Sequence, residues 1–228
     1  MRDNFAEILK PYSADFPHLT AAFSAAAAIA PRERLAWAKE QRKSILRDGW
    51  FINTPVGSRG DGETVEDHVQ HLMQLIRRFF PAALQTQAEV YAEYHDDHEV
   101  LAHAVIDGIR RDLNPQFNRC AYRISVDDKK AIEAQARIIL FEGFPELKDT
   151  VDAYPNASDP ASKLFSDLDK ICVMWKCADF VESGRYEYSD FHAYWEYWTP
   201  ENVRKKCSPF ISEIYEADLW SRVQKFQL

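Results

Sequence analysis

Apolar residues recur at helical spacing along most of the chain, most clearly in residues 63–81. Residues three, four or seven positions apart share one face of a helix. In this stretch the residues on that face are Val65, Leu72, Leu75, Ile76 and Phe79. Thr64 precedes them as a helix cap, and Pro81 marks the end because proline interrupts a helix. The pattern therefore predicts one amphipathic helix over this range.

Similar start and stop signals predict helices on both sides of this one. The predicted ranges are 31–49, 86–97, 125–144 and 159–184, with two more helices in 185–228. Ser125 or Asp127 is placed to cap the third of these ranges. No segment alternates apolar and polar residues as a half-buried strand does, and only 7 glycines are available for tight turns. We predict an all-α single domain over residues 1–228, a bundle of roughly seven to ten helices.

Composition narrows the classes of protein that this chain can belong to. Hydrophobic residues make up 46% of the 228 residues, enough for a buried core. The formal net charge of −8 opposes binding to the phosphates of DNA or RNA, but it is compatible with one pocket for a nucleotide. The four cysteines show no C-x-x-C spacing and are expected to be buried and reduced. No signal peptide is evident and the alanine-rich run 21–30 is too short to span a membrane, so we expect a cytoplasmic protein.

The histidines are concentrated, with five of the seven between positions 68 and 103. His68 lies on the apolar face of the helix predicted over 63–81. His95 ends an apolar stripe and is followed by Asp96, and both side chains can face one ion only if the helix ends there. Imidazole nitrogen and carboxylate oxygen are common ligands of divalent metals. These residues are therefore candidate metal ligands, whereas Asp97 receives no role and is expected to be solvated.

A further acidic ligand can come from the helix predicted over 159–184, which carries Asp167, Asp169 and Asp179. Asp169 shares a face with Cys172, three residues on. Asp179 lies ten residues after Asp169, which rotates it about 80° around the helix, so the two cannot both face one centre. A carboxylate in an apolar stripe is costly unless it is paired or bound to a metal. On spacing alone, Asp169 and Asp179 remain equal candidates.

The order of these residues resembles the HD-domain phosphohydrolase superfamily, and within it the small YfbR-like 5′-deoxynucleotidase group. Four segments carry the resemblance: RDGW (47–50), ETVEDH (63–68), YHDDHEV (94–100) and LDKICVMWKCADFVE (168–182). They resemble that group's R-x-G-W, E-S-V-x-E-H and H-D-x-x-E-V motifs and its last ligand helix. The resemblance implies a helical core of the HD-domain type over about 47–183, with a helical N-terminal extension (1–46) and aromatic-rich C-terminal helices (185–228).

The resemblance also implies a divalent metal site, with Mn, Co, Zn, Mg or Fe as the ion. The implied ligands are His68, His95, Asp96 and Asp169. This assignment favours Asp169 over Asp179. A bound ion of this kind lowers the pKa of a water molecule so that it can attack phosphorus. Asp96 is thereby a catalytic residue as well as a ligand, and Glu99 matches the family's catalytic carboxylate, which moves a proton.

Residues near the metal ligands are predicted to bind the substrate. Arg47 and Arg59 are the nearest candidates for its phosphate, because a guanidinium matches phosphate oxygens, and the alternative is a solvated surface arginine. Trp50 borders the nucleoside or belongs to the core. The family's aspartate after the E-V pair is replaced by Ala104, so Asp107 takes its place only if a small insertion is allowed.

We therefore expect a metal-dependent phosphohydrolase that releases phosphate from a 5′-(deoxy)nucleoside monophosphate. The alternatives are a deoxynucleoside triphosphate hydrolase of the same superfamily and a non-catalytic HD protein that senses a nucleotide. The extra His98 and His103 leave a second metal open, as in the two-iron oxygenases of the superfamily. The aromatic run 191–200 leaves open a helical interaction protein. A small nucleotide is the expected partner, without nucleic acid or membrane, and related enzymes suggest a homodimer.

Overall fold

The computed structural model describes residues 17–45, 47, 62–101, 126–156 and 159–227. Within these ranges the chain forms helices and no strand, which confirms the predicted all-α class for this part of the chain. No described helix is long and apolar enough to cross a membrane. The chain divides into two compact units. Of the described residues, unit 1 holds 17–45, 47, 62–67, 94–101 and 126–150, and unit 2 holds 68–93, 151–156 and 159–227.

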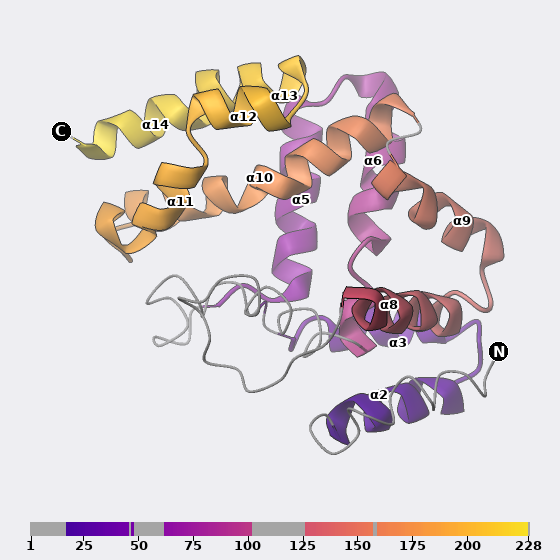
Figure 1. The fold of residues 1–228 in the computed structure, drawn as a ribbon. Coiled ribbons are helices and arrows are strands. Elements are labelled where there is room, and N and C mark those ends of the chain that lie inside the picture. Colours follow the sequence, from indigo (N-terminus) through magenta and orange to yellow (C-terminus); the bar gives the residue numbers. More distant parts are fainter. Residues whose placement is uncertain (1–16, 46, 48–61, 102–125, 157–158, 228) are drawn as a thin grey trace. The chain divides into compact units, whose positions relative to one another are not determined.

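Helix α8 (Val126–Leu140) is the centre of unit 1 and packs against α2 (Pro17–Ala28) and α3 (Arg34–Gln41) (Figure 1). It confirms the helix predicted over 125–144, although Ser125, a suggested cap, lies outside the described residues. A turn then leads into α9 (Pro145–Ala153), which the sequence pattern did not predict. Apolar residues of α2, α3, α8 and the following turn are buried: Leu19, Phe23, Ala26, Leu35, Ala38, Ile132, Ala136, Leu140 and Phe141.

A buried arginine links these helices of unit 1. Arg34 opens α3, and its guanidinium donates to the carbonyl oxygens of Ile29 and Ile139, both at 2.9 Å. It also forms an ion pair with Glu142. Ile29 follows α2 and Ile139 lies in the last turn of α8. Because a buried charge is costly without partners, these bonds fix the start of α3 against the ends of its two neighbours.

The α3 helix is shorter than the predicted range 31–49, and the reason is a backbone pairing that local spacing does not encode. The N–H of Arg47 donates to the carbonyl of Glu63 at 2.8 Å, and the N–H of Val65 donates to the carbonyl of Ile45 at 2.9 Å. The chain after α3 therefore pairs with the residues before the next helix. These bonds replace the helical bonds that would have continued α3.

Helices α5 (Val65–Phe79) and α6 (Ala82–Tyr94) confirm the two predicted helices in the middle of the chain. Thr64 caps α5 as expected: its hydroxyl accepts from the N–H of Asp67 at 3.0 Å, and the Asp67 carboxylate accepts from the N–H of Thr64 at 3.0 Å. The division between the units falls inside both helices, after Asp67 in α5 and after Glu93 in α6.

The long helix α10 (Pro160–Glu182) organises unit 2 and agrees with the predicted range 159–184. Asp159 caps it by accepting from the N–H of Ser162 at 2.9 Å, and the Ser162 hydroxyl accepts from the N–H of Asp159 at 3.1 Å. Gly184 follows its end with a φ of 70°, a conformation that glycine adopts at little cost.

The C-terminal part of unit 2 contains more helices than the two predicted. They are η5 (Tyr188–Phe191), α11 (His192–Tyr197), α12 (Pro200–Lys206), α13 (Pro209–Ile214), the π-helix η6 (Tyr215–Trp220), α14 (Ser221–Val223) and η7 (Gln224–Gln227). One more short helix, η4 (Tyr154–Asn156), precedes α10. Pro200 and Pro209 each begin a new helix, which divides the tail into short pieces. In Figure 1, α13 and η6 lie against α10, and α12 lies beside α13.

Two aromatic residues of the run 191–200 belong to the core of unit 2. Phe191 and Trp195 are buried, and the Phe191 ring stacks on Phe180 of α10 with centroids 6.1 Å apart. Tyr197 is the exposed member, and Lys206 donates to its hydroxyl. Of the two interpretations of this run, the packed core describes Phe191 and Trp195.

Candidate metal centre

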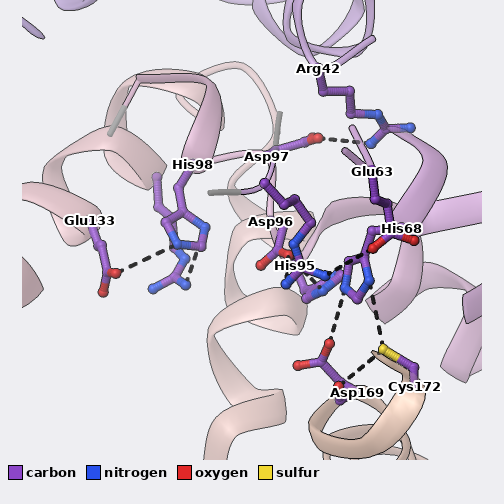
Figure 2. Close-up of polar contacts among 12 residues, drawn as sticks. Arg42, Glu63, His68, His95, Asp96, Asp97, His98, Glu133, Asp169 and Cys172 are labelled. Atoms are coloured by element: carbon purple, nitrogen blue, oxygen red, sulfur yellow. Dashed lines mark hydrogen bonds and ion pairs between the residues drawn. The ribbon is translucent and has the colours of Figure 1, made fainter. Parts of the chain in front are cut away.

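Unit 2 brings together an imidazole, a carboxylate and a thiol that can hold a metal ion: His68 of α5 with Asp169 and Cys172 of α10. The His68 Nε2 atom lies 3.1 Å from Oδ1 of Asp169, and its Nδ1 atom lies 3.7 Å from Sγ of Cys172 (Figure 2). His68 is 1% exposed, whereas the Asp169 side chain is 25% exposed. The group is therefore anchored in the core and reaches solvent through its carboxylate.

The other two aspartates of α10 have different partners. Asp179 is exposed, and its carboxylate accepts from Nη2 of Arg222 at 2.6 Å. Asp167 is buried and accepts from Lys163 at 2.8 Å and from the backbone N–H of Ser208 at 2.7 Å. Spacing alone left Asp169 and Asp179 equal, and within unit 2 it is Asp169 that lies beside His68. Its role as a metal ligand stays a prediction.

Asp167 has a structural role, which follows from its hydrogen bonds. Burial alone would raise the pKa of its carboxyl group, but hydrogen bonds from Lys163, Ser208 and Lys170 together hold the pKa below its usual range. The carboxylate is therefore charged and fixes the start of α13 to α10, since Ser208 is the residue before that helix.

Unit 1 holds the second imidazole–carboxylate pair in the turn after α6. The helix ends at Tyr94, and residues 95–98 form turns in which the N–H of Glu99 donates to the carbonyl of Asp96 at 2.9 Å. The Nε2 atom of His95 lies 3.1 Å from Oδ2 of Asp96. Both residues are buried. The sequence indicated that these neighbours could face the same point only if the helix ended there, and the turn meets that condition.

A buried ion pair fixes this turn, and it involves a residue to which the sequence gave no role. Asp97 was expected to be solvated, and that expectation is wrong. Its side chain is 0% exposed and its Oδ1 atom accepts from Nη1 of Arg42 at 2.9 Å (Figure 2). Arg42 follows α3, is 2% exposed and also pairs with Glu66. Because Arg42 and Asp97 are 55 positions apart, no local pattern pairs them.

Arg47 lies between two acidic side chains of unit 1. Its Nη2 atom is 3.8 Å from Oδ2 of Asp96, and its Nη1 atom is 3.9 Å from Oε2 of Glu63. Glu63 is buried and was not predicted as a site residue, although it opens the ETVEDH segment. The backbone bond between Arg47 and Glu63 holds the two residues side by side. The partly exposed guanidinium of Arg47 therefore lies beside Asp96, a candidate metal ligand. The predicted contact of Arg47 with a phosphate requires such a position.

His98 has surroundings that argue against a cation at its ring. It is buried, and its Nδ1 atom accepts from Nη2 of Arg137 at 3.4 Å, because an arginine can only donate. Its Nε2 atom lies 3.9 Å from Oε1 of Glu133. Burial and the charge of Arg137 lower the pKa of His98 to about 3, so the ring is neutral. A second metal at this histidine would stand beside the Arg137 guanidinium, which repels it.

Several predicted site residues receive no geometric test. Trp50, Arg59, Asp107 and the extra His103 lie outside the described residues. Glu99 is described and is half-buried in the short helical turn after Asp96 and His98. Its predicted role as a proton carrier stays a prediction.

The described residues thus offer two donor sets of similar chemistry, His68 with Asp169 and Cys172 in unit 2, and His95 with Asp96 in unit 1. Imidazole nitrogen with carboxylate oxygen suits Zn, Mn, Co or Fe, and a thiol widens the choice only toward softer ions.

No protein-family model matches the chain, and neither the curated proteins nor the solved structures contain a match to it.

Proposed function

We propose that this chain is a metal-dependent phosphohydrolase of the HD-domain type that releases phosphate from 5′-(deoxy)nucleoside monophosphates. One observation carries the proposal: each unit holds a buried imidazole next to a carboxylate, with 3.1 Å between the imidazole nitrogen and the carboxylate oxygen. The residues in these pairs are the ones that the motif order selects, His68 with Asp169 and His95 with Asp96. A helical scaffold does not need two such pairs for stability, because a buried polar group is costly.

The four proposed ligands of a single divalent ion are His68, His95, Asp96 and Asp169. This assignment rests on the order of the sequence motifs and on the pair found within each unit. The donors fit the ion, since neutral imidazole and ionised carboxylate are the forms that bind Mn, Co, Zn or Fe. When bound, such an ion lowers the pKa of a coordinated water toward neutrality and stabilises negative charge on phosphoryl oxygens.

The side chains around these pairs are assigned the remaining tasks. Arg47 binds a phosphoryl oxygen, because its guanidinium is 25% exposed and lies beside Asp96, and a guanidinium matches phosphate oxygens. Glu99, in the same turn as Asp96, takes up or delivers a proton during cleavage. On this assignment, Glu99→Gln lowers turnover by roughly 10²–10⁴-fold while metal content is unchanged, because the amide cannot exchange a proton.

The test is a phosphate-release assay on protein stripped of metal and reloaded with Mn, Co or Zn. Nucleoside monophosphates and triphosphates are offered separately, and the products are identified. Inorganic phosphate from monophosphates supports the nucleotidase assignment, whereas polyphosphate from triphosphates would identify a triphosphate hydrolase instead. The reloaded wild type should be active with monophosphates, and Asp96→Ala should be no more active than stripped protein.

A matched pair of variants on α10 separates the metal site from general damage. Asp169→Asn removes the carboxylate beside His68 and should abolish metal-dependent release. Asp179→Asn alters an exposed aspartate on the same helix, paired with Arg222, and should retain activity. Equal inactivity of reloaded wild type and Asp96→Ala on every nucleotide would contradict the proposed catalytic function.

A further inference from the structure

The two ring nitrogens of His68 have different neighbours, and the difference gives Cys172 a task. Nε2 faces the Asp169 carboxylate at 3.1 Å, and Nδ1 faces Sγ of Cys172 at 3.7 Å. We infer that Cys172 is a positioning residue, which holds the proton of His68 on Nδ1 and so presents Nε2 to a divalent metal. This inference rests on the proposed function, because it concerns the same ion.

The thiol of Cys172 has a second contact that decides its role toward the ring. Its Sγ atom lies 3.2 Å from the backbone carbonyl oxygen of Asp169, and the S–H donates to that oxygen. The sulfur then offers its lone pairs to the ring and accepts from the Nδ1–H of His68. The bonds run in one direction, from imidazole to thiol to carbonyl, so when an ion binds, the ring proton stays on Nδ1 and Nε2, which faces the Asp169 carboxylate at 3.1 Å, carries none.

A histidine that binds a metal through one nitrogen usually donates the other N–H to an acceptor, which fixes the ring orientation and its tautomer. The acceptor is commonly a carboxylate, a carbonyl or water, and here it is a buried sulfur. His68 itself is buried, so no water replaces this acceptor cheaply. Cys172 thereby contributes to metal affinity without touching the ion.

The competing arrangement makes Cys172 a ligand, since its sulfur, His68 and Asp169 each offer a donor atom within 4.8 Å of the others. Figure 2 shows the Asp169 carboxylate and the Cys172 sulfur facing different nitrogens of the His68 ring. Lone pairs on the two nitrogens point away from each other. An ion shared by Nε2 and the Asp169 carboxylate therefore leaves the sulfur on the far side of the ring.

The experiment compares Co²⁺ binding by the full-length wild type, Cys172→Ala and Cys172→Ser, with Cys177→Ala as the control. Cys177 is equally buried on the same helix and lies outside the His68 group. Cys172→Ala should weaken Co²⁺ binding by about tenfold or more, as loss of such a partner does. Serine can donate to the Asp169 carbonyl and accept from Nδ1–H, so Cys172→Ser should recover most of the affinity. Cys177→Ala should bind as the wild type does, and circular dichroism checks that all four proteins are folded.

Absorption spectra of the Co²⁺ proteins complete the test. The wild type should show no thiolate-to-cobalt charge-transfer band in the near ultraviolet. Such a band, lost in Cys172→Ser, would make Cys172 a ligand and overturn the inference. Unchanged affinity in Cys172→Ala would overturn it as well, while leaving the proposed metal site intact. A wild type that binds no Co²⁺ would instead contradict the proposed function, and the inference with it.

Discussion

The buried ion pair between Arg42 and Asp97 allows the sharpest prediction about stability. Arg42→Met keeps an unbranched apolar stem but removes the guanidinium and its charge, and leaves the Asp97 carboxylate buried without this partner. The side chains are 2% and 0% exposed. Removing one partner of such a pair typically costs about 3–5 kcal/mol, because the charge that stays in the core has lost this ion pair. Loss of the contact with the partly exposed Glu66 adds at most about 1 kcal/mol.

The assay is urea unfolding followed by circular dichroism, together with thermal melting. For a chain of this length 1 kcal/mol corresponds to about 2–4 °C, so the combined loss of about 3–6 kcal/mol in Arg42→Met should lower the melting temperature by roughly 6–24 °C. Adding Asp97→Asn to Arg42→Met should recover part of the loss, since the buried charge is then gone. Lys43→Met is the control: Lys43 and Glu40 form an exposed ion pair, which should contribute less than about 1 kcal/mol. A loss below about 1 kcal/mol in Arg42→Met would refute the reasoning.

Three further substitutions test a buried carboxylate and two glycine positions. Asp167 has a pKa held below its ordinary value of 3.8, so its stabilisation is fully present above that value and is lost as the pH falls through 3.8 toward the folded-state pKa. Urea unfolding of Asp167→Asn should therefore show lower stability at pH 7 and a smaller further loss on acidification than the wild type, and parallel pH curves would contradict this. Gly143→Ala would place a Cβ 2.8 Å from the backbone oxygen of Pro31, which should cost about 1–3 kcal/mol. Equal stability of the wild type and Gly143→Ala would contradict this, because it would mean that the backbone moves away from the new Cβ at no cost. Gly184→Ala meets no neighbour within 4 Å, so it should lose only the roughly 1–2 kcal/mol that its positive φ costs an alanine.

Local sequence signals predicted the helices whose ends depend on neighbouring residues. Thr64 with Asp67 and Asp159 with Ser162 form the caps of α5 and α10, and each cap closes within four residues of sequence. Gly184 marks the end of α10 with its positive φ. These features are encoded within one turn of the chain, so spacing and residue type suffice to find them.

Features set by distant partners were not predictable in the same way. The early end of α3 depends on bonds to residues before α5. The burial of Asp97 depends on Arg42, 55 positions away. Helical spacing could not separate Asp169 from Asp179, because the partners that distinguish them, His68 and Arg222, lie on other helices. Residue type indicated which side chains could hold a metal, and only the tertiary fold shows their partners.

The central claim is that one ion requires both imidazole–carboxylate pairs. The most direct test is elemental analysis of the protein after loading with Mn, Co or Zn and removal of free metal. The wild type should retain a single ion per chain, and both Asp96→Ala in unit 1 and Asp169→Asn in unit 2 should lose it, while Asp179→Asn keeps it. A wild type without metal, or variants that each retain an ion after losing one pair, would contradict the account.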